Sequence, residues 1–338
     1  MKRQQVRAAV LRGTSWAELR KAALAIALVL ASPLSLLATP APQKQVEDSA
    51  PCLIADVSRS GLQSGNSATK QQTETGSGTA YSENKQGIAA ITGVPADLKK
   101  AEHWFEKAAR RGYAPAQVNL AMMYLQGWGV VRNDGAALYW LTLAAQQGQP
   151  MALFDLGQLY FKGCGVRRDY AEALRLFQKA ARNGNAAAEV NIGFMYDVGL
   201  GVPRDGGAAA EWYRKAAEAG EPAGEFNLGD LYRQGQGVGQ NDCSAFEWFQ
   251  KAAAQGHRKA QAMIGFMYAA GRGTPKDLEA AYAWTAAAQS EGEPHIQDSP
   301  SLAEIERQLP FDAIQRAKGR AQLLARPSKQ PAAFALLY

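Results

Sequence analysis

The sequence predicts an all-α fold, an α-α superhelix (solenoid) built from helix-turn-helix repeats. The first observation is a period of 36 residues that recurs in five full copies between about residues 92 and 292. The second is helical spacing within each copy, where Ala116, Leu120, Met123 and Tyr124 fall on one helix face. The third is that no segment of this region needs the alternation typical of a strand. Together these observations favour stacked helix pairs over a closed globule.

Each repeat begins with a first helix that carries a tyrosine and ends at a glycine. The tyrosines recur in register at Tyr124, Tyr160, Tyr196, Tyr232 and Tyr268. A G-x-G pair follows each of them, as Gly199 and Gly201 follow Tyr196. A glycine just after the last periodic residue is typical of a helix C-terminus. A phosphate-binding loop would need a strand before these glycines, so we interpret them as turns.

An aspartate precedes the second helix of each repeat. The series is Asp134, Asp169, Asp205, Asp242 and Asp277, with one extra residue before the first and the fourth. An aspartate here can accept hydrogen bonds from the unpaired N–H groups of the helix start. We therefore expect all five to be N-caps.

The second helices carry indoles beside pairs of alanines. Tryptophan recurs at Trp140, Trp212, Trp248 and Trp284, and Leu176 occupies the remaining position. Small alanines let the second helix approach its neighbours, and the indole is expected to fill the space beside them. A fully buried Trp212 would make Trp212→Ala cost about 3–5 kcal/mol.

These positions resemble the Sel-one-like repeat family, a branch of the tetratricopeptide-like superhelices. The matching pattern runs A-x-x-x-I-G-x-x-Y-x-x-G-x-G-V-x-x-D through residues 188–205 and continues to Gly220. The resemblance implies a right-handed superhelix of five full repeats. A degenerate repeat precedes them, with Gly93–Gly112 as its second helix, and helices cap the C-terminal end. Some relatives hydrolyse β-lactams, but their paired cysteines are missing here, so no enzyme activity is expected.

The chain divides into five segments by composition. Residues 1–41 are basic and then apolar, with 17 uncharged residues from Ala22 to Ala38, which predicts a signal peptide or an uncleaved signal anchor. The polar segment 42–88 is expected to be a disordered linker. The solenoid is placed at 89–295, capping helices at 296–326 and a tail at 327–338.

Composition argues against several classes of function. The net charge is +6, but residues 1–41 hold six basic residues and one acidic residue, so +6 − 5 = +1 remains for the rest. That balance gives no reason to expect nucleic-acid binding. The three histidines are scattered, so neither a metal site nor a cofactor is expected. Cys164 and Cys243 lie in different repeats, and we expect no bridge between them.

One series of first-helix residues goes beyond what the repeat core needs. On the side opposite the tyrosines, amide and aromatic side chains recur, at Asn119, Asn191, Asn227, Phe154, Phe194, Phe226 and Phe266. In tetratricopeptide-like superhelices the first helices line the concave side, so these residues are candidate contacts to an extended protein segment. The alternative is that the rings pack between repeats and the asparagines bond locally.

The sequence predicts an exported protein, and its resemblance to periplasmic bacterial members of the family implies a scaffold or regulator that binds a protein partner in the cell envelope. Its expected location is the periplasm, with contact to the inner membrane only if residues 1–41 stay attached. One alternative is a hydrolase or carbohydrate-binding protein that uses the acids Asp155, Asp197 and Asp230 near the concave face. Another is a structural component of a secretion or exopolysaccharide complex.

Overall fold

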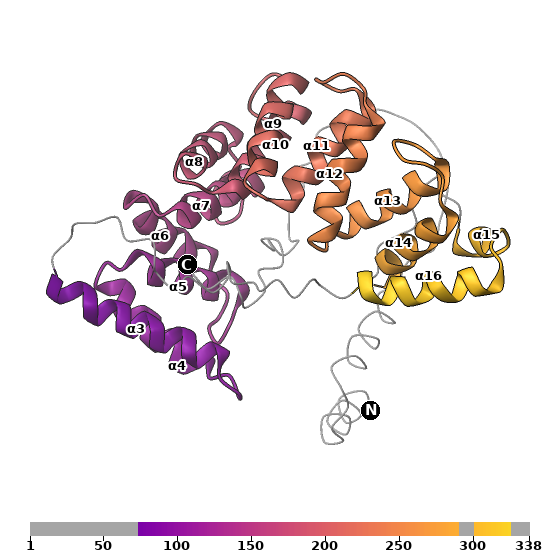
Figure 1. Cartoon of the computed structure of the whole chain (residues 1–338). Coiled ribbons are helices and arrows are strands. Elements are labelled where there is room, and N and C mark those ends of the chain that lie inside the picture. The colour runs from indigo at the N-terminus through magenta and orange to yellow at the C-terminus, as the bar shows by residue number, and fades with distance from the viewer. Residues whose placement is uncertain (1–73, 291–300, 326–338) are drawn as a thin grey trace, which may run out of the picture. The chain divides into compact units, whose positions relative to one another are not determined.

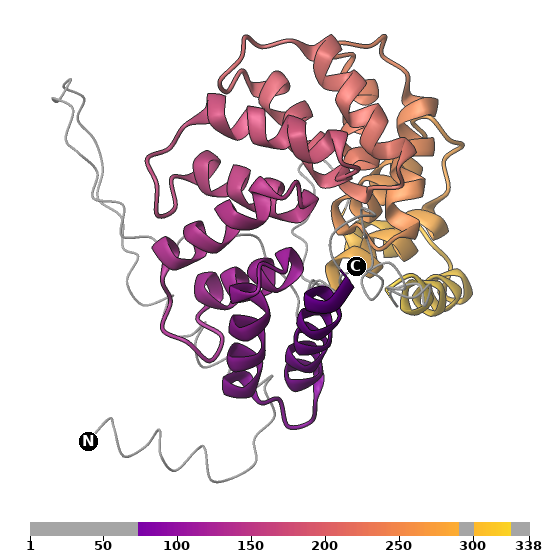
Figure 2. The same ribbon diagram turned by 90° about the vertical axis from the view of Figure 1, so that its left-hand side faces the viewer.

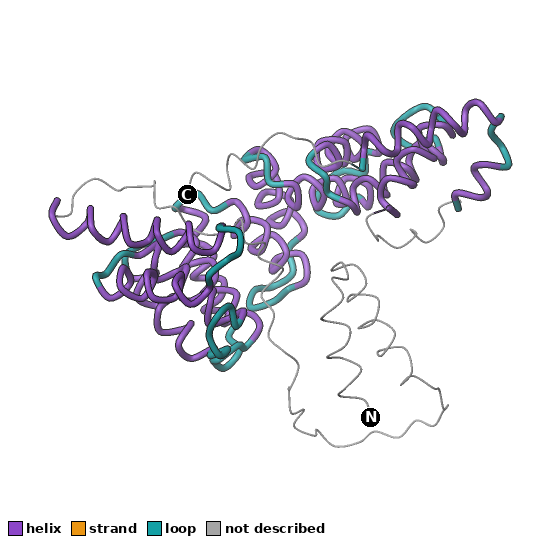
Figure 3. The backbone as a smooth tube through the Cα atoms, turned by 90° about the horizontal axis from the view of Figure 1, so that it is seen from below, coloured by secondary structure: helices purple, strands orange, loops and turns teal. Residues whose placement is uncertain are grey.

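The computed structural model describes residues 74–290 and 301–325, which belong to one compact unit, Pro51–Tyr338. Every regular element in these residues is an α-helix, as Figure 3 shows. The all-α repeat fold is thereby confirmed. The predicted signal segment, residues 1–41, and the tail, residues 327–338, lie outside the described residues.

The helices alternate between first and second helices, and helices that follow one another in sequence pack together (Figures 1 and 2). The first helices are α3 (Glu74–Thr92), α5 (Ala114–Gln126), α7 (Pro150–Lys162), α9 (Ala186–Val198), α11 (Pro222–Gln234) and α13 (Arg258–Ala270). The second helices are α4 (Leu98–Arg110), α6 (Asp134–Gln146), α8 (Tyr170–Arg182), α10 (Gly206–Glu218), α12 (Asp242–Ala254) and α14 (Leu278–Ser290). Two further helices follow, α15 (Leu302–Glu306) and α16 (Phe311–Leu324).

The turn inside each repeat depends on its two glycines. After α9, Gly199 has a φ of +82° and donates its N–H to the carbonyl oxygen of Met195, which ends the helix. Gly201 has a φ of +72° and lies against the start of α8, where an added Cβ would come within 2.8 Å of the Cβ of Tyr170. The first glycine therefore ends the first helix, and the second lets the preceding repeat approach closely.

Three of the five predicted aspartate caps of second helices are confirmed. Asp205 donates its N–H to the carbonyl oxygen of Tyr196 at 2.8 Å, which closes the loop. Its carboxylate accepts from the N–H of Ala208 at 3.0 Å. Asp169 and Asp277 make the corresponding cap bonds. The tyrosine of each first helix is thus tied through its backbone to the cap of its second helix.

The N-cap predictions for Asp134 and Asp242 are wrong. The caps of α6 and α12 are Asn133 and Asn241, whose side-chain oxygens accept backbone N–H groups at 2.9 and 3.0 Å. Each aspartate is the first residue of its helix and forms an ion pair with an arginine. Asparagine and aspartate cap a helix equally well. The caps therefore keep the 36-residue register, and the extra residue is not an insertion.

The core side chain of most second helices lies one residue after the position of the indole. These buried residues are Phe105, Leu141, Phe177, Tyr213 and Phe249. The rings pack over glycines of the first helices. A Cβ on Gly157 would lie 2.7 Å from the ring of Phe177, and one on Gly229 would lie 3.0 Å from that of Phe249.

The indoles themselves are only half-buried, contrary to the prediction for Trp212. The ammonium of Lys215 lies 4.1 Å from the Trp212 ring centroid, and that of Lys251 lies 3.7 Å from the Trp248 ring centroid. Trp212 and Trp248 therefore each form a cation–π contact at the surface and are not fully buried in the core. Truncating Trp212 should cost much less than the 3–5 kcal/mol expected for a buried indole.

The N-terminal repeat is more complete than the sequence suggested. α3 begins at Glu74, so residues 74–88 belong to a helix and not to the predicted linker. Ala80 and Ile91 are buried in one cluster with Phe105. The sequence of α3 is polar, which is why it resembles a linker. Its Glu83 is nevertheless buried in the structure, and the carboxylate of Glu83 pairs with the guanidinium of Arg111 at 3.0 Å.

The C-terminal end of the solenoid is covered by α15 and α16. Pro310 precedes α16, whose buried face consists of Ala313, Ala317 and Ala321. This helix packs along α14. The guanidinium of Arg316 also pairs with the carboxylate of Glu279 on α14, at 2.9 Å.

The two cysteines within the described residues differ in redox state, which the sequence did not predict. Cys164 is buried and disulfide-bonded, whereas Cys243 is exposed and carries a free thiol. The two are therefore not bridged to each other, which confirms the prediction. Cys52, the third cysteine of the chain, lies outside the described residues.

Candidate protein-binding surface

The predicted asparagine row is mostly engaged inside the protein. Asn119 is fully buried on α5, and its amide nitrogen donates to the side-chain oxygen of Asn84 on α3 at 2.9 Å. Its assignment as a contact to a partner is therefore wrong. The cause is α3, which covers this part of α5 and lies largely in the segment predicted to be a linker.

Asn191 on α9 also has its amide occupied. Its nitrogen donates to the carbonyl oxygen of Ala187 at 2.8 Å, and its oxygen accepts from the amide of Gln158 at 3.1 Å. The second bond links neighbouring first helices, which is the local role proposed as the alternative. Asn227 is half-buried on α11 and keeps its place as a candidate contact.

Three of the four candidate phenylalanines pack largely between helices. Phe154 lies 5.7 Å from Phe177, centroid to centroid. Phe226 is stacked on the imidazole of His257 at 4.7 Å, and burial lowers the pKa of that imidazole to about 4. Phe266 is half-buried in the same cluster. For these rings the packing interpretation holds, although each keeps some exposed area.

Phe194 differs because 40% of its surface is exposed. Val198, four residues later on α9, is 51% exposed and falls on the same helix face. On the neighbouring first helix α7, the ring of Phe161 lies 6.3 Å from that of Phe194. We call Phe161, Phe194 and Val198 the Phe194 patch. An exposed apolar cluster of this kind is characteristic of an interaction surface.

The sequence analysis missed two members of this patch. Phe161 takes the position held by Asp197 and Arg233 in the next two repeats, and Val198 takes that of Gln234. An apolar residue where other repeats carry polar ones is a signal that a comparison of repeats could have found. The spacing of four residues between Phe194 and Val198 is a second signal.

Charged groups border the first-helix surface without forming an acid pair. Asp230 on α11 is held by the guanidinium of Arg233 at 2.7 Å. Asp155 on α7 is only 4% exposed, and burial raises the pKa of its carboxyl to about 7. Asp197 is half-buried on α9. A glycoside hydrolase of the common type would need two carboxylates that face one substrate, and a buried acid with an ion-paired one does not provide that arrangement.

Neither a metal site nor a membrane-spanning helix is found in the described residues. No group of three His, Cys, Asp or Glu side chains there could hold a metal ion. None of the helices in residues 74–290 and 301–325 combines the length and apolar character of a membrane span.

Comparison with known proteins identifies the repeats. The family model described as Sel1 repeat matches residues 86–113, 114–149, 150–185, 186–221, 222–257 and 258–290. The crystal structure of a Sel1 repeat protein from Oxalobacter formigenes is 33% identical, with a TM-score of 0.62, over 65% of this chain and 91% of that chain. No curated protein sequence matches the chain.

Two further crystal structures are more distant. A protective antigen of uropathogenic Escherichia coli strains is 25% identical over 74% of this chain and 69% of that chain, with a TM-score of 0.40. An immunity protein from Pseudomonas aeruginosa is 19% identical over 76% of this chain and 85% of that chain, with a TM-score of 0.46.

Proposed function

The chain belongs to the Sel1 repeat family, and we propose that it is an exported scaffold or regulator that binds a protein partner along its first helices. The Sel1 repeat fold generally mediates protein–protein interaction and is typically non-enzymatic. The proposal goes further in three respects, which are the binding surface, the export and the role in the cell envelope.

The observation that carries the binding surface is the exposure of the Phe194 patch. Phe194 is 40% exposed, and the corresponding residues of the two neighbouring repeats are the polar Gln158 and Asp230. Val198 is 51% exposed, and its counterparts there are Lys162 and Gln234, so the repeat fold alone does not require apolar residues at these positions. Aromatic anchors of this kind contribute most of the energy of many interfaces. The first helix α11, which contacts α9, carries polar groups, including the Asp230–Arg233 ion pair and the half-buried amide of Asn227. An apolar centre with a polar rim suits a protein segment.

Two observations support export. Residues 1–41 combine a basic start, an uncharged run and small residues near 38–41, as secretory signals do. Cys164 is disulfide-bonded, and such bonds persist mainly in oxidising compartments. The proposed location is the periplasm of a bacterium, with anchorage to the inner membrane as the alternative if the segment is not cleaved.

N-terminal sequencing of the protein from a periplasmic extract is expected to give a start after residues 38–41. Cleavage there follows from the small residues that succeed the apolar run. A chain that retains Met1 in the inner-membrane fraction would favour the anchor. Recovery of an intact chain from the cytoplasm would contradict export.

Phe194→Ala is expected to weaken partner binding by about 1–3 kcal/mol, because it removes an aromatic anchor. The partner would first be recovered from the cell's own envelope fraction with the wild-type protein, and its affinity then measured by calorimetry. The free energy of unfolding should change by less than about 1 kcal/mol, since the ring is 40% exposed. Val131→Ala is a matched control, because Val131 is 88% exposed in a loop. Early melting with unchanged affinity would show that the ring is structural.

A hydrolase or carbohydrate-binding activity is a weaker candidate, because it rested on Asp155, Asp197 and Asp230. A structural role in a secretion or exopolysaccharide complex stays compatible with the proposed scaffold. Recovery of partners from the envelope fraction distinguishes a structural component from a regulator with a single partner. A structural component of a complex should recover several proteins in fixed proportion.

A further inference from the structure

The outer face of α6 differs from that of other second helices. After Asp134, α6 carries no charged residue, and the two outward positions hold Tyr139 and Leu143. Four other second helices place polar or charged residues there, namely His103 and Lys107, Arg175 and Lys179, Glu211 and Lys215, and Glu247 and Lys251. All eight are exposed. Four second helices that face solvent thus carry polar or charged side chains at these outward positions, whereas α6 carries Tyr139 and Leu143 there.

Trp140 has no lysine over its indole ring, because the residue three positions later is Leu143. In three repeats a lysine three residues after the tryptophan lies over its ring, at 5.0 Å for Trp104, 4.1 Å for Trp212 and 3.7 Å for Trp248. In α6 that position is Leu143, which has no charge to place there. The ring of Tyr139 meets the Trp140 ring edge-on at 5.0 Å and leaves 58% of the tyrosine exposed.

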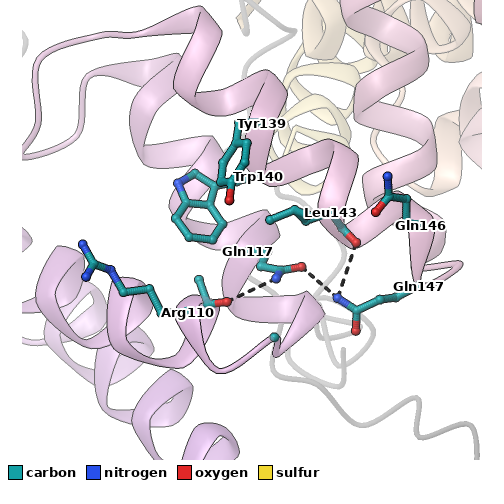
Figure 4. Close-up of a pocket in the computed structure, with 9 residues that line it drawn as sticks. Arg110, Gln117, Tyr139, Trp140, Leu143, Gln146 and Gln147 are labelled. Atoms are coloured by element: carbon teal, nitrogen blue, oxygen red, sulfur yellow. Dashed lines mark hydrogen bonds between the residues drawn. The ribbon is translucent and has the colours of Figure 1, made fainter.

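A cavity of about 460 Å³ opens beside this indole, between the end of α4, α5 and α6 (Figure 4). Trp140 and Leu143 line its apolar side. Its polar side consists of side-chain amides and of Arg110 at the end of α4. Gln117 donates to the carbonyl oxygen of Ala109 at 3.2 Å and accepts from the amide of Gln147 at 2.9 Å. The cavity can therefore receive an apolar side chain beside hydrogen-bonding groups that are already fixed.

The same chain shows what covers a second helix that has no charged residue at these two outward positions. In α14 the positions equivalent to Tyr139 and Leu143 are Ala283 and Ala287, which are 1% and 0% exposed. Here α16 packs along α14. The buried face of α16 is formed by Ala313, Ala317 and Ala321, which are spaced four residues apart. Within the described residues, by contrast, α6 packs on α5 and α7. Its outer face stays open, as the exposure of Tyr139 shows.

We propose that the outer face of α6, formed by Tyr139, Trp140 and Leu143, is a docking surface for an amphipathic helix of a partner protein. One apolar side chain of that helix enters the cavity beside Trp140. Docking desolvates no charge on α6, which removes a cost that the lysine-bearing repeats would carry. The amides of Gln146 and Gln147 lie at the edge of the surface and form a polar rim. This surface is separate from the Phe194 patch.

The test uses a peptide with the sequence of residues 311–324, because α16 is the covering helix seen in this chain. The full chain is labelled with 5-fluorotryptophan, and the Trp140 line is assigned by comparison with Trp140→Phe. The peptide is expected to shift this line saturably in fluorine NMR. Leu143→Lys should weaken the binding at least tenfold. This variant introduces the lysine found at the same position of four other second helices, so the fold should be kept, which circular dichroism checks.

Two controls make the result specific. A peptide with Ala317→Glu breaks the apolar stripe and should not shift the line. Arg175→Gln changes the residue of α8 that corresponds to Tyr139 of α6, and it should leave the peptide affinity unchanged. The proposal is overturned if the peptide causes no saturable shift, or if Leu143→Lys binds it as well as the wild type. A shift caused by maltohexaose instead would make the cavity a saccharide site. Broadening with protein concentration alone would make a second copy the occupant.

Discussion

Phe249→Ala is expected to lower the free energy of unfolding by about 3–5 kcal/mol. Phe249 is fully buried on α12, and its ring centroid lies 5.4 Å from that of Phe226. It also packs over Gly229, where an added Cβ would lie only 3.0 Å from the ring. Alanine would leave a cavity between α11 and α12 that neither backbone can fill. Because a repeat contacts only its neighbours, loss of hydrogen-exchange protection should be greatest in the adjoining repeats.

Trp248→Ala is the matched control and is expected to cost less than about 1.5 kcal/mol. The indole is half-buried, and its outer contact is the ammonium of Lys251 at 3.7 Å from the ring centroid. An exposed cation–π contact contributes about 0.5–1 kcal/mol. Urea unfolding of both variants decides the matter. Equal losses would mean that the indole, and not the phenyl ring, is the core residue of α12.

This pair also shows what the periodicity could and could not predict. The 36-residue period identified the helices, their order and their turns, because each repeat restates the same signals. It could not decide which of two adjacent aromatic residues faces inward, since both recur with the same period. The missing information was which of the two rings faces the glycine of the first helix, and in the structure the ring of Phe249 packs over Gly229.

Two other errors had local causes. The sequence-based prediction assigned the cap to an aspartate in every repeat. In two repeats the cap is an asparagine, Asn133 or Asn241, whose side-chain oxygen is an equivalent acceptor. The start of the solenoid was missed because α3 buries Glu83 and Asn84, and buried polar residues make a helix look like a linker. Their partners, Arg111 and Asn119, lie in later helices, so only the tertiary structure reveals them.

The candidate site was predicted in part for the same reason. The sequence placed Phe194 on the correct helix and gave it a role beyond the core. It also placed Asn119 on the open surface, where in fact α3 covers it. The exposure of a residue on a first helix depends on its neighbouring repeats. Sequence alone shows those neighbours only where their pattern is regular.

Gly237→Ala is expected to destabilise the protein by about 2–4 kcal/mol, from left-handed strain and overpacking together. Gly237 has a φ of +66°, a conformation that costs other residues about 1–2 kcal/mol. An added Cβ would also lie 2.0 Å from the backbone carbon and oxygen of Gly206, at the start of α10. Because these are backbone atoms, a rotamer change cannot relieve the clash. The repeats on either side of this contact would have to move apart.

Gly256→Ala separates the two contributions. Gly256 has a φ of +84°, but an added Cβ there would meet nothing within 4 Å. This variant should therefore lose only the strain, about 1 kcal/mol, in urea unfolding measured under the same conditions. The difference between the two variants measures how tightly α10 is held against the following turn. If both variants lose the same free energy of unfolding, the repeats can move apart at this point at little cost. Gly237 would then be needed only for the conformation of the turn.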